Sequence, residues 1–359
     1  MEHPENDAAF KALKVNKGVI THTVNPFFKR RRQNKHTLSE YVEGILKGDI
    51  ALLSQAVTLV ESVKPEHRQF AQEIIEQCLP YTGQSVRIGF TGIPGAGKST
   101  SIDTFGMHLV RQGNKIAVLA IDPSSERTKG SILGDKTRME ALSREKNAFI
   151  RPSPTAGSAG GVARKTRETI ILCEAAGFDT VFVETVGVGQ SETAVHSMVD
   201  FFLLILLAGT GDELQGIKRG IMEMADGIII NKADGDNVEK ARIAASNYRN
   251  ALHLFPRADS GWRPKVLTCS AYYTVGIGEV WDMISDYLQF TKQNGYFERK
   301  RYEQAKYWMY ESINYRLHEA FYHHPEVKAQ LPVMEQKVAN NEISSFIAAK
   351  QTIELFLNH

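Results

Sequence analysis

The sequence has few cysteines, no long apolar run and little net charge. Among 359 residues there are three cysteines, Cys78, Cys173 and Cys269, a scattered and odd set that fits neither a disulfide framework nor a metal-binding pattern. The longest apolar run, 201–208, is too short to span a bilayer. The acidic first residues lack the apolar segment of a signal peptide. A net charge of +2 indicates no nucleic-acid or membrane partner, so we expect a cytoplasmic protein.

The most informative stretch is rich in glycine. It fits the pattern G-x-x-x-x-G-K-[ST] with the residues Gly92, Ile93, Pro94, Gly95, Ala96, Gly97, Lys98, Ser99 and Thr100. Residues 86–90 predict a strand before it and residues 101–110 a helix after it, which is the context of a phosphate-binding loop. Glycines let backbone N–H groups face the phosphates at the positive end of the helix dipole. We expect Lys98 to reach the β- and γ-phosphates and the Ser99 hydroxyl to bind Mg²⁺.

Strands and helices alternate after this loop begins. Near-continuous apolar segments predict strands at 116–121, 180–183, 201–207, 227–230 and 266–268. Such segments are typical of strands covered on both faces. The predicted fold class is therefore α/β, a doubly wound and mainly parallel sheet with ligands at the carboxyl ends of its strands. The predicted divisions are an N-terminal arm with helices at 1–84, a P-loop domain at 85–294 and a helical segment at 295–359.

Helical patterns flank the predicted sheet on both sides. A capping box at 37–40, a cap at Asp49 and a proline-started helix at 65–78 precede it. The basic run 29–35 has no interleaved aromatic residues and favours a solvated arm over an acidic partner. Near the other end, a helix at 343–357 is predicted to follow an apolar stripe at Tyr302, Ala305, Met309, Ile313, Leu317 and Phe321. That stripe either packs on the domain or forms a dimer seam, and its aromatic content favours the seam.

A four-residue motif after the strand 227–230 indicates guanine. It consists of Asn231, Lys232, Ala233 and Asp234. A carboxylate at Asp234 accepts both N1–H and the amino group of guanine, a pair of donors that adenine lacks. We expect the stem of Lys232 to lie along the base. After the next strand, a second turn is predicted to offer a backbone N–H to guanine O6, formed by Ser270, Ala271 and Tyr272.

The strand at 180–183 leads into a predicted γ-phosphate sensor. Glu184 and Gly187 occupy the positions of D-x-x-G in G proteins, where the acid holds Mg²⁺ and the glycine N–H meets the γ-phosphate. The acid here is one methylene longer, and Val188 replaces the glutamine that orients water in Ras-like enzymes. These two departures predict either slow intrinsic hydrolysis of GTP or a water positioned by other residues.

Two further aspartates and one glycine-rich loop are candidate parts of the same site. Asp122 follows the strand 116–121, and Asp135 lies in the segment G-D-K-T-R-M, so either can join the metal shell or serve as an ordinary surface cap. The loop 209–220 follows the strand 201–207 and places Asp212 and Lys218 on the nucleotide side of the sheet. The simpler interpretation of that loop is a plain connection.

Five segments together resemble one family of G proteins. They are 92–100, 121–125, 184–192 with the sequence E-T-V-G-V-G-Q-S-E, 211–218 and 231–234. The chain from about residue 38 onward is similar to the MeaB/ArgK/MMAA family, the G-protein chaperones of adenosylcobalamin-dependent acyl-CoA mutases, chiefly methylmalonyl-CoA mutase. A glutamate at position 184 is usual in that family.

The resemblance implies roles that the residues alone do not. It implies a homodimer through C-terminal helices, and a GTPase that gates delivery of adenosylcobalamin to the mutase and protects the cofactor there. Lys98 and Ser99 would bind phosphate and Mg²⁺, while Asp122, Asp135 and Glu184 would form the metal and catalytic shell. The loop from Asp212 to Lys218 would be a third switch with a catalytic role, in which Lys218 supplies positive charge to the transition state.

Two other classes of function fit the sequence less well. A P-loop kinase of a small molecule or of an amino-acid transport protein would need no guanine preference, and Asp234 argues against it. Nickel delivery would need a cluster of histidine and cysteine, and the pair His323 and His324 is better explained as a helix end. No cobalamin motif D-x-H-x-x-G is present in the sequence, so we expect no cobalamin site in this chain. Which acyl-CoA mutase is the partner is left open.

Overall fold

The structure is a computed structural model that describes residues 36–121, 139–152, 159–185, 191–209 and 219–358. The chain divides into two units, Met1–Thr37 and Leu38–His359. The first unit lies almost entirely outside the described residues. The second unit contains all the helices and strands of the described residues.

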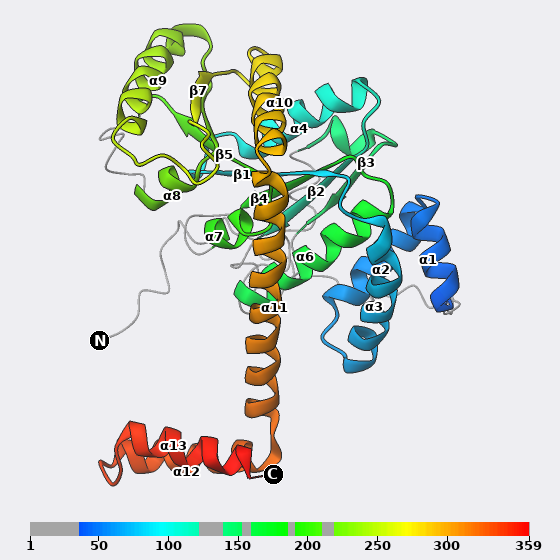
Figure 1. Ribbon diagram of the computed structural model, residues 1–359, viewed down its shortest axis with the longest axis vertical. Helices are drawn as coiled ribbons and strands as arrows, with labels where there is room; N and C mark the ends of the chain where they lie inside the picture. The colour runs from blue at the N-terminus through cyan, green and yellow to red at the C-terminus, as the bar shows by residue number, and fades with distance from the viewer. Residues whose placement is uncertain (1–35, 122–138, 153–158, 186–190, 210–218, 359) are drawn as a thin grey trace, which may run out of the picture. The chain divides into compact units, whose positions relative to one another are not determined.

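A seven-stranded sheet forms the middle of this unit (Figure 1), and every neighbouring pair of strands is parallel. The order across the sheet is β3-β2-β4-β1-β5-β6-β7. The predicted α/β class and parallel sheet are confirmed. The strands are β1 (Val86–Gly92), β2 (Ile116–Ile121), β3 (Ala148–Arg151), β4 (Thr180–Thr185), β5 (Phe201–Leu207), β6 (Gly227–Asn231) and β7 (Lys265–Thr268). The edge strand β3 was not predicted, because four residues are too few to establish a pattern.

Helices cover both faces of the sheet, as a parallel sheet requires. On one face, Ile88, Phe90 and Phe182 pack in a core shared with α4 (Lys98–Arg111) and α10 (Ile277–Gln293). The opposite face is covered along its length by α6 (Ala159–Ala175), α7 (Ser191–His196), α8 (Arg219–Met224) and α9 (Val238–Leu252). Helix α4 begins three residues earlier than predicted, directly at Lys98. The phosphate-binding loop therefore runs straight into a helix N-terminus.

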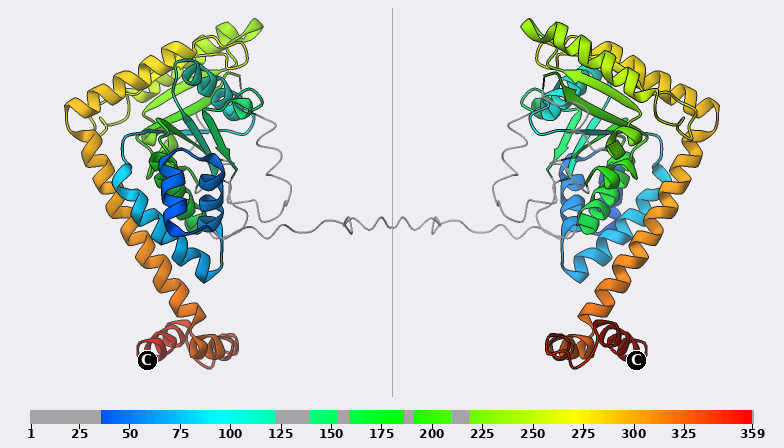
Figure 2. Two further views of the ribbon diagram at one scale, coloured as in Figure 1. Left: turned by 90° about the vertical axis from the view of Figure 1, so that its right-hand side faces the viewer. Right: turned by 90° about the vertical axis from the view of Figure 1, so that its left-hand side faces the viewer.

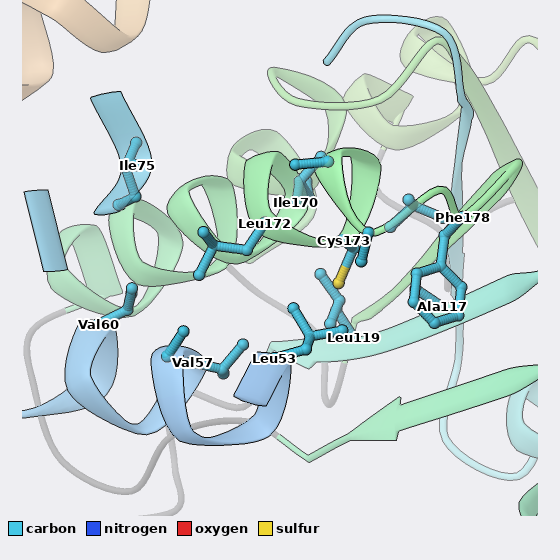
Figure 3. Close-up of a cluster of buried hydrophobic side chains, with 14 of the residues drawn as sticks. Leu53, Val57, Val60, Ile75, Ala117, Leu119, Ile170, Leu172, Cys173 and Phe178 are labelled. Carbon is cyan, nitrogen blue, oxygen red and sulfur yellow. The ribbon is translucent and has the colours of Figure 1, made fainter. Parts of the chain in front are cut away.

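The N-terminal helices pack on α6 and extend the core beyond the sheet. They are α1 (Leu38–Leu46), α2 (Ile50–Glu61) and α3 (Pro65–Cys78). Figure 3 shows Leu53 and Val57 of α2 near Leu172 of α6, and Cys173 between α6 and Leu119 of β2. The predicted cap is confirmed, since Asp49 Oδ1 accepts hydrogen bonds from the N–H groups of residues 51 and 52, at 2.8 and 3.1 Å.

The chain continues after the sheet as three helices. They are α11 (Tyr296–His323), α12 (Pro325–Ala339) and α13 (Ser345–Leu357). Figures 1 and 2 show α12 and α13 side by side at the end of α11 that is remote from the sheet. Helix α12 was not predicted. Its sequence contains Pro332, which as a rule marks the end of a helix rather than its interior.

Most of the predicted apolar stripe on α11 is exposed. Tyr302, Met309, Ile313 and Leu317 are between 44 and 67% exposed, so they do not pack on the sheet domain. The helix is instead fixed by polar contacts on another face, including a bidentate pair of Arg68 with Glu319 at 2.8 and 2.9 Å. The stripe is thus available to a partner.

The three cysteines are buried, and none of them forms a disulfide bond. In the described part of the chain, no helix combines the length and the apolar character needed to cross a membrane.

Candidate functional site

The loop between β1 and α4 has the backbone of a phosphate cradle. Gly95 and Gly97 have φ of 78° and 89°, in the left-handed region that side chains disfavour. A Cβ atom at Gly97 would lie 2.5 Å from Asn231 Nδ2, and one at Gly92 would lie 2.1 Å from the carbonyl oxygen of Ile205. The glycines at 92 and 97 are therefore required by the close approach of other groups, and their positive φ angles of 150° and 89° disfavour other residues as well.

Lys98 opens α4 and folds back over this loop. Its Nζ donates hydrogen bonds to the carbonyl oxygens of Gly92 at 2.8 Å and Ile93 at 3.3 Å. Burial lowers the pKa of Lys98, while the charges of Glu184 and Glu192 act in the opposite direction. A half-buried ammonium held mainly by neutral carbonyls gains most from an anion placed next to it. This arrangement fits the predicted contact with phosphate.

Ser99 and Glu184 come together across the sheet. The Ser99 hydroxyl donates to Glu184 Oε1 at 3.0 Å, although the two residues are 85 positions apart. Glu184 is 5% exposed and lies at the carboxyl end of β4, beside the loop. A hydroxyl and a carboxylate are hard oxygen donors of the kind that Mg²⁺ prefers, so this part of the predicted metal shell fits the ion.

The remaining predicted members of the phosphate and metal site lie outside the described residues. They are Asp122, Asp135, Gly187, Asp212 and Lys218. Among the described residues, no group of three or more His, Cys, Asp or Glu side chains is arranged to hold a metal ion. Of the predicted metal shell, the structure therefore describes Ser99 and Glu184.

Asn231 connects the phosphate loop to the predicted base loop. Its Nδ2 donates to the carbonyl oxygen of Ala96 at 2.8 Å, and its Oδ1 accepts from the N–H of Ala271 at 3.1 Å. The side chain is 2% exposed, which makes both bonds costly to lose. In the turn predicted to offer a backbone N–H to guanine O6, the N–H of Ala271 is therefore bonded to Asn231 in this structure.

Asp234 and Ser270 are also joined. The Ser270 hydroxyl donates a short hydrogen bond to Asp234 Oδ2 and accepts from the N–H of Tyr273 at 3.3 Å. Lys232 has φ of 58°, the left-handed conformation, which turns the chain sharply between Asn231 and Asp234. The hydrogen bond from Ser270 fixes one carboxylate oxygen of Asp234. The aromatic ring of Tyr272 is 78% exposed next to this turn.

One positioning group was not predicted. Thr104, in the second turn of α4, donates from Oγ1 to the carbonyl oxygen of Ala271 at 2.8 Å. The Ala271 peptide is thus held at its N–H by Asn231 and at its carbonyl by Thr104. Because Thr104 and Ala271 are 167 positions apart, no local pattern in the sequence indicates this contact.

Comparisons with known proteins found a matching family model and several similar sequences. The family model described as methylmalonyl Co-A mutase-associated GTPase MeaB matches residues 53–326. The chain is 50% identical to a putative GTPase of Caulobacter vibrioides, over 87% of this chain and 95% of the other. It is 50% identical to GTPase ArgK of Escherichia coli, over 77% and 83% of the two chains. It is 46% identical to the mitochondrial methylmalonic aciduria type A homolog of Mus musculus, over 87% and 78%.

A solved structure shares the fold. The chain superimposes on a crystal structure described as LAO/AO transport system kinase with a TM-score of 0.71 and 39% sequence identity, covering 90% of this chain and 99% of the other. The same architecture of a P-loop protein with a helical C-terminal region thus extends over most of both chains.

Proposed function

Because this chain belongs to the MeaB family of methylmalonyl-CoA mutase-associated GTPases, we propose that it gates delivery of adenosylcobalamin to an acyl-CoA mutase and protects the cofactor there. The chain is a P-loop GTPase, and GTP and GDP are the ligands of its phosphate loop. The mutase proposed is methylmalonyl-CoA mutase or a related cobalamin-dependent acyl-CoA mutase. Family membership is the observation on which this function rests.

The proposed reaction is slow hydrolysis of GTP with Mg²⁺ at Ser99 and Glu184. The hydroxyl and the carboxylate lie 3.0 Å apart at the carboxyl end of β4, where they would hold the ion against the phosphates. Mg²⁺ would supply charge stabilisation to the transferring phosphoryl group. Lys98 binds and orients the phosphates. Asp122, Asp135 and Asp212 are proposed to complete the shell, and Lys218 to add positive charge when the mutase docks.

Guanine specificity is proposed to rest on Asp234. The bond from Ser270 fixes one carboxylate oxygen, so the other can accept a donor of the base without first being ordered. The stem of Lys232 would lie along the ring, and Gly187 would meet the γ-phosphate. A kinase is the alternative function, suggested by the description of the similar crystal structure. It would predict equal use of ATP.

A homodimer is the proposed assembly. The exposed apolar stripe of α11, from Tyr302 to Leu317, would be covered by a second copy, since a contiguous exposed apolar face of this kind marks an interface. Ile313→Glu and Leu317→Asp are expected to convert the protein to a monomer in analytical ultracentrifugation. A monomeric wild type would contradict this assembly.

The test of the proposed function is GTP hydrolysis with and without purified methylmalonyl-CoA mutase, with ATP as the control nucleotide. We expect the mutase to stimulate hydrolysis of GTP, and Lys218→Ala to lose the stimulation while nucleotide binding is retained. A parallel assay measures transfer of adenosylcobalamin from its adenosyltransferase to the mutase. Equal turnover of ATP would contradict the guanine assignment, and absence of any effect on the mutase or its loading would contradict the chaperone role.

A further inference from the structure

Helix α11 holds the connection between α7 and β5, residues 197–200, through four side chains. Trp308 Nε1 donates to the carbonyl oxygen of Ser197 at 3.1 Å, and Gln304 Nε2 to that of Val199 at 2.8 Å. The next residue of the connection, Asp200, accepts at its carbonyl from Lys300 Nζ at 2.8 Å, and at its carboxylate from Arg301 at 2.7 and 2.8 Å. The spacing 300, 304, 308 places three of these donors on one face of the helix.

Two of these residues account for all the deeply buried side chains of α11. Among its 28 residues, only Gln304 and Trp308 are buried, at 6% and 8% exposed. Burying the Gln304 amide is unfavourable unless it is hydrogen-bonded. The contact of α11 with this connection therefore combines specific hydrogen bonds with apolar packing of the Trp308 side chain.

The connection leads directly back to the nucleotide site. Helix α7, Ser191–His196, precedes it and carries Glu192, which is 1% exposed. The charge of Glu192 acts on Lys98, where it favours the protonated amine. Helix α7 also packs tightly on β1, because a Cβ atom at Gly89 would lie 2.9 Å from Val195 Cγ1. A helix held this closely moves as one piece with the residues that follow it.

We propose that Gln304 and Trp308 are positioning residues of the nucleotide site, which fix α7 and its Glu192 against β1, the strand that leads into the phosphate loop. They would make the position of α11 and the occupancy of the nucleotide site depend on each other. Because such coupling is reciprocal, displacement of α11 would change nucleotide release, and nucleotide binding would tighten the hold of α11. This inference rests on the proposed function only in assuming that guanine nucleotides bind at Lys98.

The test measures release of a fluorescent GDP analogue from the full-length protein by stopped flow. Trp308→Phe keeps the aromatic ring and removes the donor to Ser197, and Gln304→Met keeps the volume and removes the donor to Val199. Without these bonds, α7 is less ordered in the free protein, and part of the binding free energy of the nucleotide is used to order it. We expect release to be about threefold to tenfold faster in either variant. The matched control is Tyr310→Phe, which removes one hydroxyl from an exposed residue of the same helix and should leave the rate unchanged.

A double-mutant cycle separates positioning from general loosening. Glu192→Gln removes the charge on α7 with little change of shape. If Trp308 acts through Glu192, Trp308→Phe should change the release rate by less than about 1.5-fold when Glu192→Gln is already present. If the two changes have additive effects on the release rate, Trp308 does not act through Glu192, and the proposal is wrong. Thermal unfolding of the nucleotide-free variants checks that they are folded. If Gln304→Met is not folded, the release rate of Trp308→Phe alone tests the proposal.

The outcomes distinguish this inference from the proposed function. If the wild type binds guanine nucleotides and both variants release them at the wild-type rate, only the positioning role is wrong. If the wild type binds no guanine nucleotide, the proposed function is wrong and the positioning role falls with it.

Discussion

The two edges of the sheet contain similar charged groups but pair them differently. At the amino edge, Arg87 donates two hydrogen bonds to Glu174, at 2.6 and 2.9 Å, and both side chains are at most 5% exposed. Arg301 forms a similar bidentate pair with Asp200 nearby. At the carboxyl edge, Lys98 donates to two backbone carbonyl oxygens instead.

The pKa values follow this difference. Burial lowers the pKa of Arg301, but its bonds and charge interaction with Asp200 outweigh burial, so the pKa is raised overall. Burial also lowers the pKa of Lys98, and there the charges of Glu184 and Glu192 do not reverse it. A buried pair of opposite charges is costly to break, whereas a cation held mainly by neutral carbonyls gains from an added anion. The charges of the amino edge therefore satisfy one another, and Lys98 at the carboxyl edge suits an anionic ligand.

The largest expected effect comes from breaking the amino edge. Arg87→Met leaves the Glu174 carboxylate buried without its guanidinium partner. We expect the free energy of unfolding in urea to fall by about 3–5 kcal/mol. The double variant Arg87→Met, Glu174→Leu removes both charges and should recover much of that loss. If the double variant loses as much as the two single variants added together, the two residues are not coupled.

The same pair predicts an acid dependence. Burial raises the pKa of Glu174, but the hydrogen bonds from Arg87, Ser85 and Gly83 outweigh it, and the pKa is lowered overall. A lowered pKa stabilises the folded state above the pKa of the unfolded chain, about 4.3, and this stabilisation is lost as the pH falls through the folded value. Unfolding measured from pH 7 to pH 3 should show a steeper acid loss in the wild type than in Arg87→Met, Glu174→Leu. Parallel curves would contradict the assignment.

The next largest effect is expected at the carboxyl edge, and on activity. Lys98→Ala should lower kcat for GTP hydrolysis by about a hundredfold to a thousandfold, the usual result of removing one donor to developing charge. It should lower the free energy of unfolding of the nucleotide-free protein less than Arg87→Met does, because Lys98 donates its hydrogen bonds to backbone carbonyl oxygens, whereas Arg87 forms a bidentate pair with a carboxylate. A large loss of stability in Lys98→Ala would remove the contrast between the two edges.

A smaller effect is expected at the base loop. Asp234→Asn replaces an acceptor by an amide that can donate, so preference should move from guanosine to xanthosine triphosphate. Loss of hydrogen bonds to a charged group predicts about a tenfold to hundredfold loss of GTP affinity, measured by competition against a fluorescent nucleotide. Retained preference for GTP over xanthosine triphosphate would place guanine recognition elsewhere.

The smallest effect is expected outside the sheet, at the N-cap of α2. Asp49→Ala removes the cap of α2 and should cost about 1 kcal/mol of unfolding free energy, without changing nucleotide affinity. Asp49→Asn, which keeps an acceptor, is the matched control. A change in nucleotide affinity in Asp49→Ala would mean that the N-terminal helices are coupled to the site.

The carboxyl edge could be predicted from the sequence and the amino edge could not. The residues 92–100 and 231–234 form local motifs, each next to a strand that its own apolar run indicates. Glu174, Asp200 and Arg301 have no such spacing, since their partners lie 87 to 218 positions away. One signal was present in the sequence. Arg87 interrupts the apolar strand β1, and a charge in a buried strand requires a buried partner.

The helical tail illustrates the same limit. Periodicity located α11 and α13, but Pro332 concealed α12, because a proline in a helix interior is tolerated only when packing compensates for the lost hydrogen bond. The hydrogen bonds of Gln304 and Trp308 to the α7–β5 connection could not be predicted, since their acceptors are backbone carbonyls that leave no trace in the side-chain pattern.

The amide of Asn231 has a consequence for how partial ligands would behave. One end of it is bonded to the loop that we propose receives phosphate, and the other to the loop that we propose receives the base. When a ligand binds only one loop, the free energy of ordering both loops therefore reduces its affinity. A second ligand that binds the other loop does so after both loops are ordered, and its affinity is not reduced in this way. Guanosine and pyrophosphate, added as separate molecules, would each strengthen the binding of the other without touching it, which calorimetry of one in the presence of the other would reveal. For the same reason, the binding free energy of the intact nucleotide would be more favourable than the sum of the binding free energies of guanosine and pyrophosphate measured separately.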